Sequence, residues 1–150
     1  MGTFLDTTVF IQFERQLRRL PAEGAMAEVG ARLTRELGDR EDVAIAAITA
    51  SELLHGVHRA SPENLSRREA FVEAVIQAFP PVPFDLLAAR AHARLWARLA
   101  AARIDIGAHD RLVAATAIAS GWRVGTANLG HYEHIEGLQV VALDLAAQGS

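Results

Sequence analysis

The 150-residue sequence contains no cysteine and no lysine. Without cysteine the chain has no disulfide, no thiolate nucleophile, and no site in which cysteine binds zinc or an iron–sulfur cluster. Without lysine it has no mechanism that depends on a catalytic lysine, because all 15 of its Lys and Arg residues are arginines. The absence of cysteine also fits a cytoplasmic protein, which is the location we expect.

Long apolar runs and an excess of positive charge are missing too. No segment approaches the roughly 18 apolar residues of a membrane span, and no basic segment with an apolar core precedes Asp6. We therefore expect neither a membrane protein nor a signal peptide. The formal net charge of −3 argues against a protein that coats nucleic acid, but not against an enzyme with local positive patches.

What is present predicts one globular α/β domain over residues 1–150. Hydrophobic residues make up 51% of the chain and charged residues 22%, a composition typical of folded domains. Short apolar strands are expected in five segments, "TFLD", "DVAIAAI", "PPVPF", "WRVGTA" and "LQVVAL". Longer helices are expected between them, at about 9–20, 22–37, 49–60, 62–79, 86–102 and 108–120. This alternation predicts a mostly parallel central sheet of about five short strands, with helices on both faces.

Helical spacing also predicts which side chains face the core. Apolar side chains at this spacing are expected in the core rather than in a groove for a partner helix: Phe10, Phe13, Leu17 and Leu20. Three further side chains of the helix 86–102 are expected to face inward: Leu95, Trp96 and Leu99. Arginines every four residues on the same helix predict a solvated face rather than an RNA contact: Arg90, Arg94 and Arg98.

Oxygen-bearing side chains follow the predicted strands. Asp6 ends the first strand, and Glu52 lies in the first turn of the helix after the second. Asp110 opens the helix 108–120, and Asn128 directly follows the strand "RVGTA". Functional groups of parallel α/β sheets collect at the carboxyl ends of the strands, near a topological switch point. We therefore expect these four side chains to converge.

Converging carboxylates predict a cation. They repel one another, and their pKa values rise unless a positive charge is present. A hard divalent ion such as Mg²⁺ or Mn²⁺ takes oxygen ligands, keeps several waters and bridges to phosphate groups. Such an ion lowers the pKa of a bound water and stabilises charge on a phosphodiester, so the pattern favours metal-assisted phosphoryl transfer.

Each of these residues also has a purely structural interpretation. Asp6 suits the N-cap of a helix that begins at Thr8. The segment "TASE" reads as a capping box, with Thr49 as the cap and Glu52 at its third position. Asp110 favours a helix N-terminus through the helix dipole, and an asparagine in a turn is common. From the residues alone, both interpretations stay open.

Four motifs occur in an order and spacing that resemble the PIN-domain nucleases, and specifically the VapC-type toxins of bacterial toxin–antitoxin pairs. They are "FLDTTVFI", "ITASELLHGV", "IGAHDRLVAATAI" and "VGTANLGHYEHIEGLQVVAL". The likeness extends from about Thr3 to Leu143. It implies a PIN-like fold and an endoribonuclease that cleaves structured RNA such as tRNA or rRNA. It also implies a small VapB-like antitoxin as partner, and commonly a homodimer.

The resemblance assigns roles to individual residues. Asp6, Glu52 and Asp110 match the three family carboxylates that bind Mg²⁺ or Mn²⁺ and activate water. Thr7 and Thr126 match hydroxyl positions that support the acids by hydrogen bonding.

Two further positions bear on the number of metal ions. Asn128 falls where relatives carry Asp or Asn as a fourth, less strict metal ligand, and its amide oxygen can coordinate but brings no charge. His131 stands where many relatives have an acid. Both residues argue against a second metal ion. They also keep open a PIN-like module that binds RNA or a partner with little or no cleavage.

Other enzyme classes fit the sequence less well. "ELLH" has the Glu-x-x-His spacing of di-iron bundles, but those need two such motifs on a four-helix bundle. Two histidine pairs have spacings that could hold zinc, although exposed unpaired histidines are the simpler interpretation: His55 with His58, and His131 with His134. A phosphotransferase of the haloacid-dehalogenase type also begins with an acid after its first strand. Here Thr8 occupies the place of its second acid.

Overall fold

A computed structural model describes residues 1–146 of the chain. Its strands are β1 (Gly2–Leu5), β2 (Asp42–Ala46), β3 (Pro81–Val82), β4 (Arg123–Thr126) and β5 (Val140–Ala142). Its helices are α1 (Thr7–Gln16), α2 (Ala22–Leu37), α3 (Ala47–His58), α4 (Pro62–Ala78), α5 (Leu86–Ala102) and α6 (Ala108–Ser120), with a 3₁₀ turn, η1 (Leu129–His131). The final four residues of the predicted 1–150 domain lie outside the described residues.

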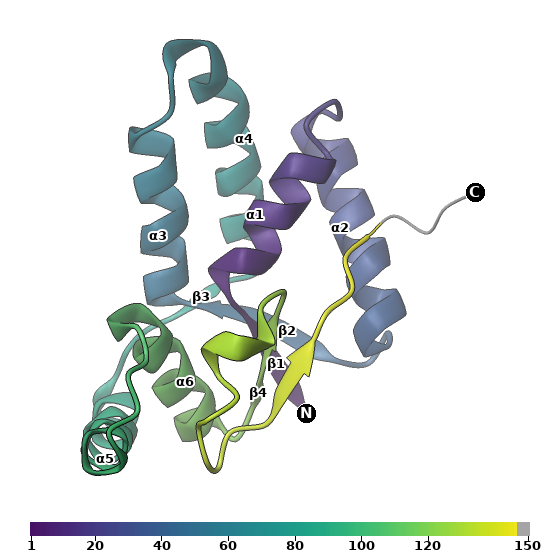
Figure 1. The fold of residues 1–150 in the computed structure, drawn as a ribbon. Helices are drawn as coiled ribbons and strands as arrows, with labels where there is room; N and C mark the ends of the chain where they lie inside the picture. The colour runs from purple at the N-terminus through teal and green to yellow at the C-terminus, as the bar shows by residue number, and fades with distance from the viewer. Residues whose placement is uncertain (147–150) are drawn as a thin grey trace.

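The five strands form one sheet in the order β3-β2-β1-β4-β5, and every neighbouring pair is parallel. This confirms the predicted α/β architecture. The chain runs from β1 to β2 and β3 on one side, then returns to add β4 and β5 on the other (Figure 1). The order therefore reverses at β1, and the carboxyl ends of β1 and β4 border the switch point where such sheets bind ligands.

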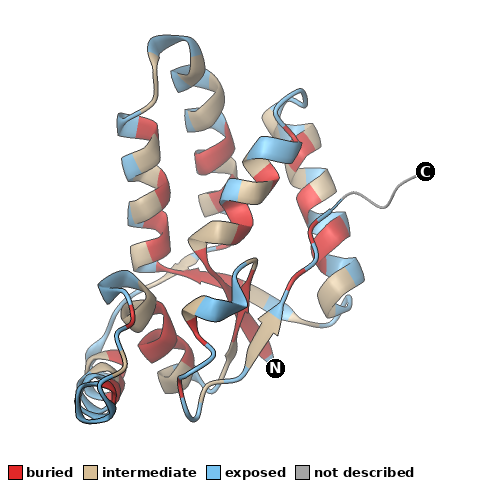
Figure 2. Cartoon of the chain, viewed as in Figure 1, coloured by how far each residue is buried: buried red, intermediate tan, exposed pale blue. Residues whose placement is uncertain are grey.

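Helices cover both faces of the sheet, and each face has its own apolar core (Figures 1 and 2). Helices α1 to α4 pack on one face, against Leu5 and Ile45 among others. Helices α5 and α6 pack on the other, against Phe4, Ala44 and Ala46. Successive residues of a strand point to opposite faces, so buried strands of this kind are apolar throughout. This explains the short continuous apolar runs in the sequence.

Several predicted helix boundaries agree with the structure, and one predicted helix start does not. Helices α2 and α6 have the predicted bounds, and Asp85 caps α5 by accepting a 2.9 Å hydrogen bond from Ala88 N. The predicted capping box at Thr49 is wrong, because β2 passes directly into α3 at Ala47. Thr49 lies buried inside the helix, and Glu52 belongs to its second turn.

The predicted core is largely confirmed, with Trp96 as an exception. Leu95 and Leu99 are buried in the core on the α5 and α6 side of the sheet. Phe10, Phe13 and Leu17 are buried in the core on the other side. Trp96 is 55% exposed, and so the prediction that it faces inward is wrong. One residue turns a helix by about 100°, which carries position 96 out of the stripe that begins at Ala88. Leu20, beyond the end of α1, is 42% exposed.

The arginines of α5 match their prediction. Arg90, Arg94 and Arg98 are all exposed, as expected of a solvated helix face. No helix among residues 1–146 combines the length and the apolar character needed to cross a membrane.

Candidate active site

Asp6 lies at the carboxyl end of β1 and is only 2% exposed. It caps α1, since its Oδ1 accepts hydrogen bonds from the backbone N–H of Thr8 at 3.1 Å and the hydroxyl of Thr8 at 2.5 Å. Its Oδ2 accepts a 2.6 Å hydrogen bond from the hydroxyl of Thr126 at the end of β4. Capping and a place in the site are therefore compatible roles, and the three donors offset the desolvation of the carboxylate.

Thr8 and Thr126 form a small hydroxyl network around Asp6. Their oxygens lie 3.3 Å apart, and each also accepts a backbone N–H from the segment after β4. The donors are Ala127 for Thr8 and Asn128 for Thr126. This network fixes the loop after β4 against the start of α1, which sets the position of the Asp6 side chain.

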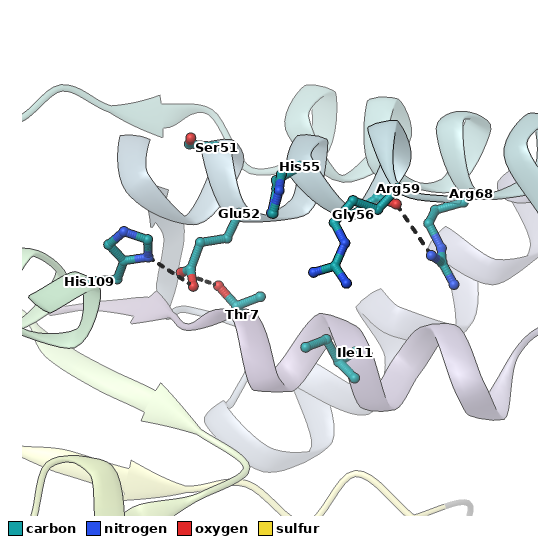
Figure 3. A pocket seen from close by; sticks show the side chains of 9 residues that line it. All are labelled: Thr7, Ile11, Ser51, Glu52, His55, Gly56, Arg59, Arg68 and His109. Atoms are coloured by element: carbon teal, nitrogen blue, oxygen red, sulfur yellow. Dashed lines mark hydrogen bonds and ion pairs between the residues drawn. The ribbon is translucent and has the colours of Figure 1, made fainter. Parts of the chain in front are cut away.

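Glu52 reaches the same region from α3. Its Oε1 accepts a 2.7 Å hydrogen bond from the hydroxyl of Thr7, and its Oε2 lies 3.4 Å from Nδ1 of His109 (Figure 3). Thr7 therefore contacts Glu52 rather than Asp6. His109 stands in the first turn of α6, directly before Asp110, so this contact joins α3 to α6.

Asp110 completes the group of acids from the first turn of α6. The hydroxyl of Tyr132 donates a 3.4 Å hydrogen bond to its Oδ1, and Nδ1 of His131 lies 3.4 Å from its Oδ2. Tyr132 is 1% exposed, so its ring is part of the core under the site. The segment after β4 thus contacts Asp110 through two neighbouring residues.

The electrostatics show that the three carboxylates share one environment. Burial raises the pKa of Asp110 above its ordinary value, and the negative charges of Asp6 and Glu52 raise it further. His131 and the hydrogen bond from Tyr132 act in the opposite direction. Burial also raises the pKa of the Tyr132 phenol, followed by the charges of Asp6 and Asp110. Tyr132 therefore stays protonated and remains a hydrogen-bond donor.

Asn128 is held differently from the acids. Its backbone N–H is bound to Thr126, while the residue is exposed and its side-chain oxygen lies beside Gly130. His131, three residues further along the chain, places its ring beside Asp110 instead. The structure thus brings Asp6, Glu52 and Asp110 together and leaves Asn128 at the rim.

The donor set suits a hard divalent cation. All three acids offer oxygen. Burial raises the pKa of Asp110, the charges of Asp6 and Glu52 raise it further, and a cation would relieve both effects. In the present side-chain arrangement, no three His, Asp or Glu residues within 1–146 are placed to hold one ion together. The oxygens of Asp6 are engaged by threonines, and those of Glu52 by Thr7 and His109.

Sequence reasoning missed three of the contacting residues. Thr8 had a local signal, because a residue two positions after an aspartate often donates to its side chain. The sole tyrosine, Tyr132, follows the fourth strand, which places it near the site but does not indicate its contact. His109 had no signal, since its contact with Glu52 depends on the packing of α6 beside α3.

The chain is similar to known proteins along most of its length. The family model described as PIN domain matches residues 3–134. Ribonuclease VapC1 of Rickettsia felis is 33% identical over 144 residues, 95% of this chain and 97% of that protein. The tRNA(fMet)-specific endonuclease VapC of Salmonella typhimurium is 32% identical over 97 residues, 64% of this chain and 71% of that protein. Among solved structures, the DNA-bound VapBC of Salmonella typhimurium has a TM-score of 0.75 and 26% identity, covering 95% of this chain and 98% of that one.

Proposed function

The chain belongs to the PIN-domain family, among the VapC-type ribonuclease toxins, and we propose that it is a divalent-metal-dependent endoribonuclease. The motif resemblance seen in the sequence is thereby confirmed. In this proposal the enzyme hydrolyses phosphodiester bonds in structured RNA, and it acts as the toxin of a type II toxin–antitoxin system.

One observation carries the proposed chemistry. Asp110 lies where burial and the charges of Asp6 and Glu52 all disfavour its ionised form. A fold that needed only helix caps and packing gains nothing from this repulsion, whereas a metal site uses it. We assign Asp6, Glu52 and Asp110 as the residues that would hold Mg²⁺ or Mn²⁺. When bound, such an ion supplies a water of lowered pKa and stabilises charge on the phosphate.

The neighbouring residues prepare the acids for this role. Thr126 and Thr8 hold both oxygens of Asp6, and Thr7 orients Glu52. Tyr132 donates to Asp110 from a buried position, which limits the directions that this carboxylate adopts. Loss of such a contact around a metal ligand typically lowers metal affinity or activity about 10–100-fold.

Asn128 is proposed as a fourth, neutral ligand of a single ion. Its exposed position at the rim and its lack of charge fit a weak contribution better than a second metal site. The His131 ring beside Asp110 argues in the same direction, because it occupies space next to the carboxylate.

Substrate and partner follow from the family. A tRNA or an rRNA is the proposed substrate, in line with the Salmonella relative, which is a tRNA(fMet)-specific endonuclease. A VapB-like antitoxin is the proposed partner, since matching solved structures are of VapBC complexes. We propose that the partner inserts a basic side chain among the three acids, that the toxin forms a homodimer, and that it acts in the cytoplasm.

The second candidate is a PIN-like module that binds RNA or a partner with little or no cleavage. The neutral, exposed Asn128 and the imidazole of His131 beside Asp110 favour it. Purified protein incubated with tRNA and Mg²⁺ separates the two. The nuclease proposal expects discrete fragments that EDTA prevents and that fall by about 100-fold or more in Asp110→Asn. Equal cleavage by a folded Asp110→Asn protein would refute the site assignment.

A further inference from the structure

A groove leads away from Glu52 between α1 and α3 (Figure 3). It encloses about 490 Å³. At its inner end lie Thr7, Glu52 and His109, which belong to the acidic site. Its outer part is lined by His55, Gly56, Arg59 and Arg68 from α3, α4 and the turn between them, and by Ile11 from α1.

A second hollow of about 260 Å³ extends this groove toward the end of α1. The two hollows share five lining residues, which are Thr7, Ile11, Glu52, Gly56 and Arg68. The second adds Glu14 and Arg15. We call the combined channel the α1–α3 groove. Its inner end is lined by Glu52 and by His109, the neighbour of Asp110 in α6, so a ligand bound along it reaches the edge of the proposed site of chemistry.

Positive charge dominates the outer part of the groove. Beyond Glu52 its charged lining residues are Arg15, Arg59 and Arg68 against a single carboxylate, Glu14. Arg68 is fixed in place, because its Nε lies 2.9 Å from Glu14 Oε1 and its Nη1 donates to the carbonyl of Gly56 at 3.3 Å. Its guanidinium keeps further N–H groups for a ligand.

The backbone N–H of Arg59 donates to the carbonyl of His55 at 3.1 Å, but its guanidinium has no hydrogen bond or ion pair within residues 1–146. Figure 3 shows its guanidinium directed into the space between α3 and α1, across from Ile11. An arginine that points into a groove without a protein partner has all its donors available. Its planar fork matches the geometry of a phosphate group.

Gly56 gives a second, independent indication. It lies within α3, where glycine disfavours the helix, and a Cβ placed on it would meet no atom within 4 Å. Packing therefore does not require glycine at this position. The missing side chain leaves the wall of the groove flat between Glu52 and Arg68, which permits close approach of a ligand backbone.

We propose that the α1–α3 groove binds the RNA strand next to the cleaved bond, with Arg59 and Arg68 as positioning residues on its backbone phosphates. This inference rests on the proposed function, because it places the same substrate on a surface joined to the same site. RNA carries one negative charge per nucleotide, which complements the arginines. Contacts to backbone phosphates position an RNA strand without reading its base sequence. A basic protein segment would suit the three acids but would be repelled along the groove.

Binding of fluorescently labelled, unfractionated tRNA in Mg²⁺ tests the proposal separately from cleavage. The measurement uses the Asp110→Asn background, in which cleavage does not interfere. Adding Arg59→Gln is expected to weaken binding roughly tenfold, as for one lost hydrogen bond to a charged group. It should also reduce the slope of log affinity against log salt by about 0.7, the value for one phosphate of a single strand. Arg59→Lys should restore the slope, and Arg40→Gln, at an exposed turn remote from the groove, should match the background.

A substitution that fills the groove gives a readout with no charge change. Gly56→Leu and Gly30→Leu each replace a helical glycine that has open space around it, so both should keep or raise the melting temperature. Only Gly56→Leu should weaken tRNA binding, because Gly30 lies on the exposed side of α2. If the wild type binds tRNA through Arg59 but never cleaves it, the groove proposal stands and only the nuclease proposal is refuted.

Unchanged tRNA binding in both Arg59→Gln and Gly56→Leu would overturn the groove assignment. If the same two variants were also inhibited less well by the VapB-like antitoxin, the groove would be assigned to a protein partner instead.

Discussion

The hydroxyl of Thr126 donates a 2.6 Å hydrogen bond to Oδ2 of Asp6, across 120 positions of sequence. Thr126 ends β4, and Asp6 directly follows β1, its neighbour in the sheet. The bond therefore fixes a buried carboxylate at the point where the strand order reverses. One contact joins the ends of two strands and also sets the position of a site residue.

Loss of this hydroxyl should cost stability. Thr126→Val keeps the shape of the side chain but leaves one oxygen of Asp6 buried without its donor, which costs about 1–3 kcal/mol. Urea denaturation measures the change in the free energy of unfolding. Thr126→Ser retains the hydroxyl and should lose much less. Equal losses in the two variants would mean that packing, and not the hydrogen bond, accounts for the effect.

Metal-free protein should become less stable as the pH rises through the titration of Asp110. The folded state holds this proton more tightly than the unfolded state, since the pKa is raised above 3.8 in the fold. Stability is therefore lost from the ordinary aspartate pKa upward, until the raised pKa is passed. Asp110→Asn removes this loss, so its advantage over the wild type in EDTA should grow across that window. An advantage that shrinks with rising pH would contradict the assignment.

Divalent metal should reverse that destabilisation. Mn²⁺ at about 100 times its Kd should add roughly 2.7 kcal/mol to the wild type, because the ion binds only the folded state. Thermal unfolding with and without Mn²⁺ measures this as a rise in melting temperature. Asp110→Asn should lose the response, whereas Asp39→Asn, at an exposed turn, should keep it. The same rise in all three proteins would place the ion elsewhere.

The hydroxyl of Tyr132 should affect Mn²⁺ affinity, while its ring maintains the fold. Tyr132→Phe preserves the buried ring but removes the donor to Asp110, so the fold should persist while Mn²⁺ affinity falls about tenfold or more. Calorimetric titration of Mn²⁺ into both proteins gives the comparison. Identical affinities would reduce Tyr132 to a core residue.

The architecture was predictable because its signals are local. The helix at 22–37 ends at a glycine, and Asp85 precedes a long apolar stripe, so both elements follow from adjacent residues. The capping box at Thr49 shows the limit of such signals. Its four letters fit the motif, but β2 carries the chain into α3 two residues earlier and buries Thr49.

The site was predictable only in part, for a related reason. Asp6 and Asp110 stand at strand ends or helix starts, and the topology of a parallel sheet brings such positions together. The contacts of His109 and Tyr132 join elements that meet only after the sheet and helices have packed. No periodicity or motif in the sequence predicts those contacts. The role of Asn128 as a metal ligand stays a prediction.

The proposed function requires that this chain cleaves RNA with Asp6 and its neighbouring acids. Mapping new RNA 5′ ends in cells after induction of the wild type or Asp6→Asn is the measurement to make first, because the substrate need not be guessed. A nuclease with this site should leave a few strong, reproducible ends that occur only with the wild type. Identical profiles from two folded proteins free of bound inhibitor would rule out cleavage by these acids and favour the module that binds without cutting.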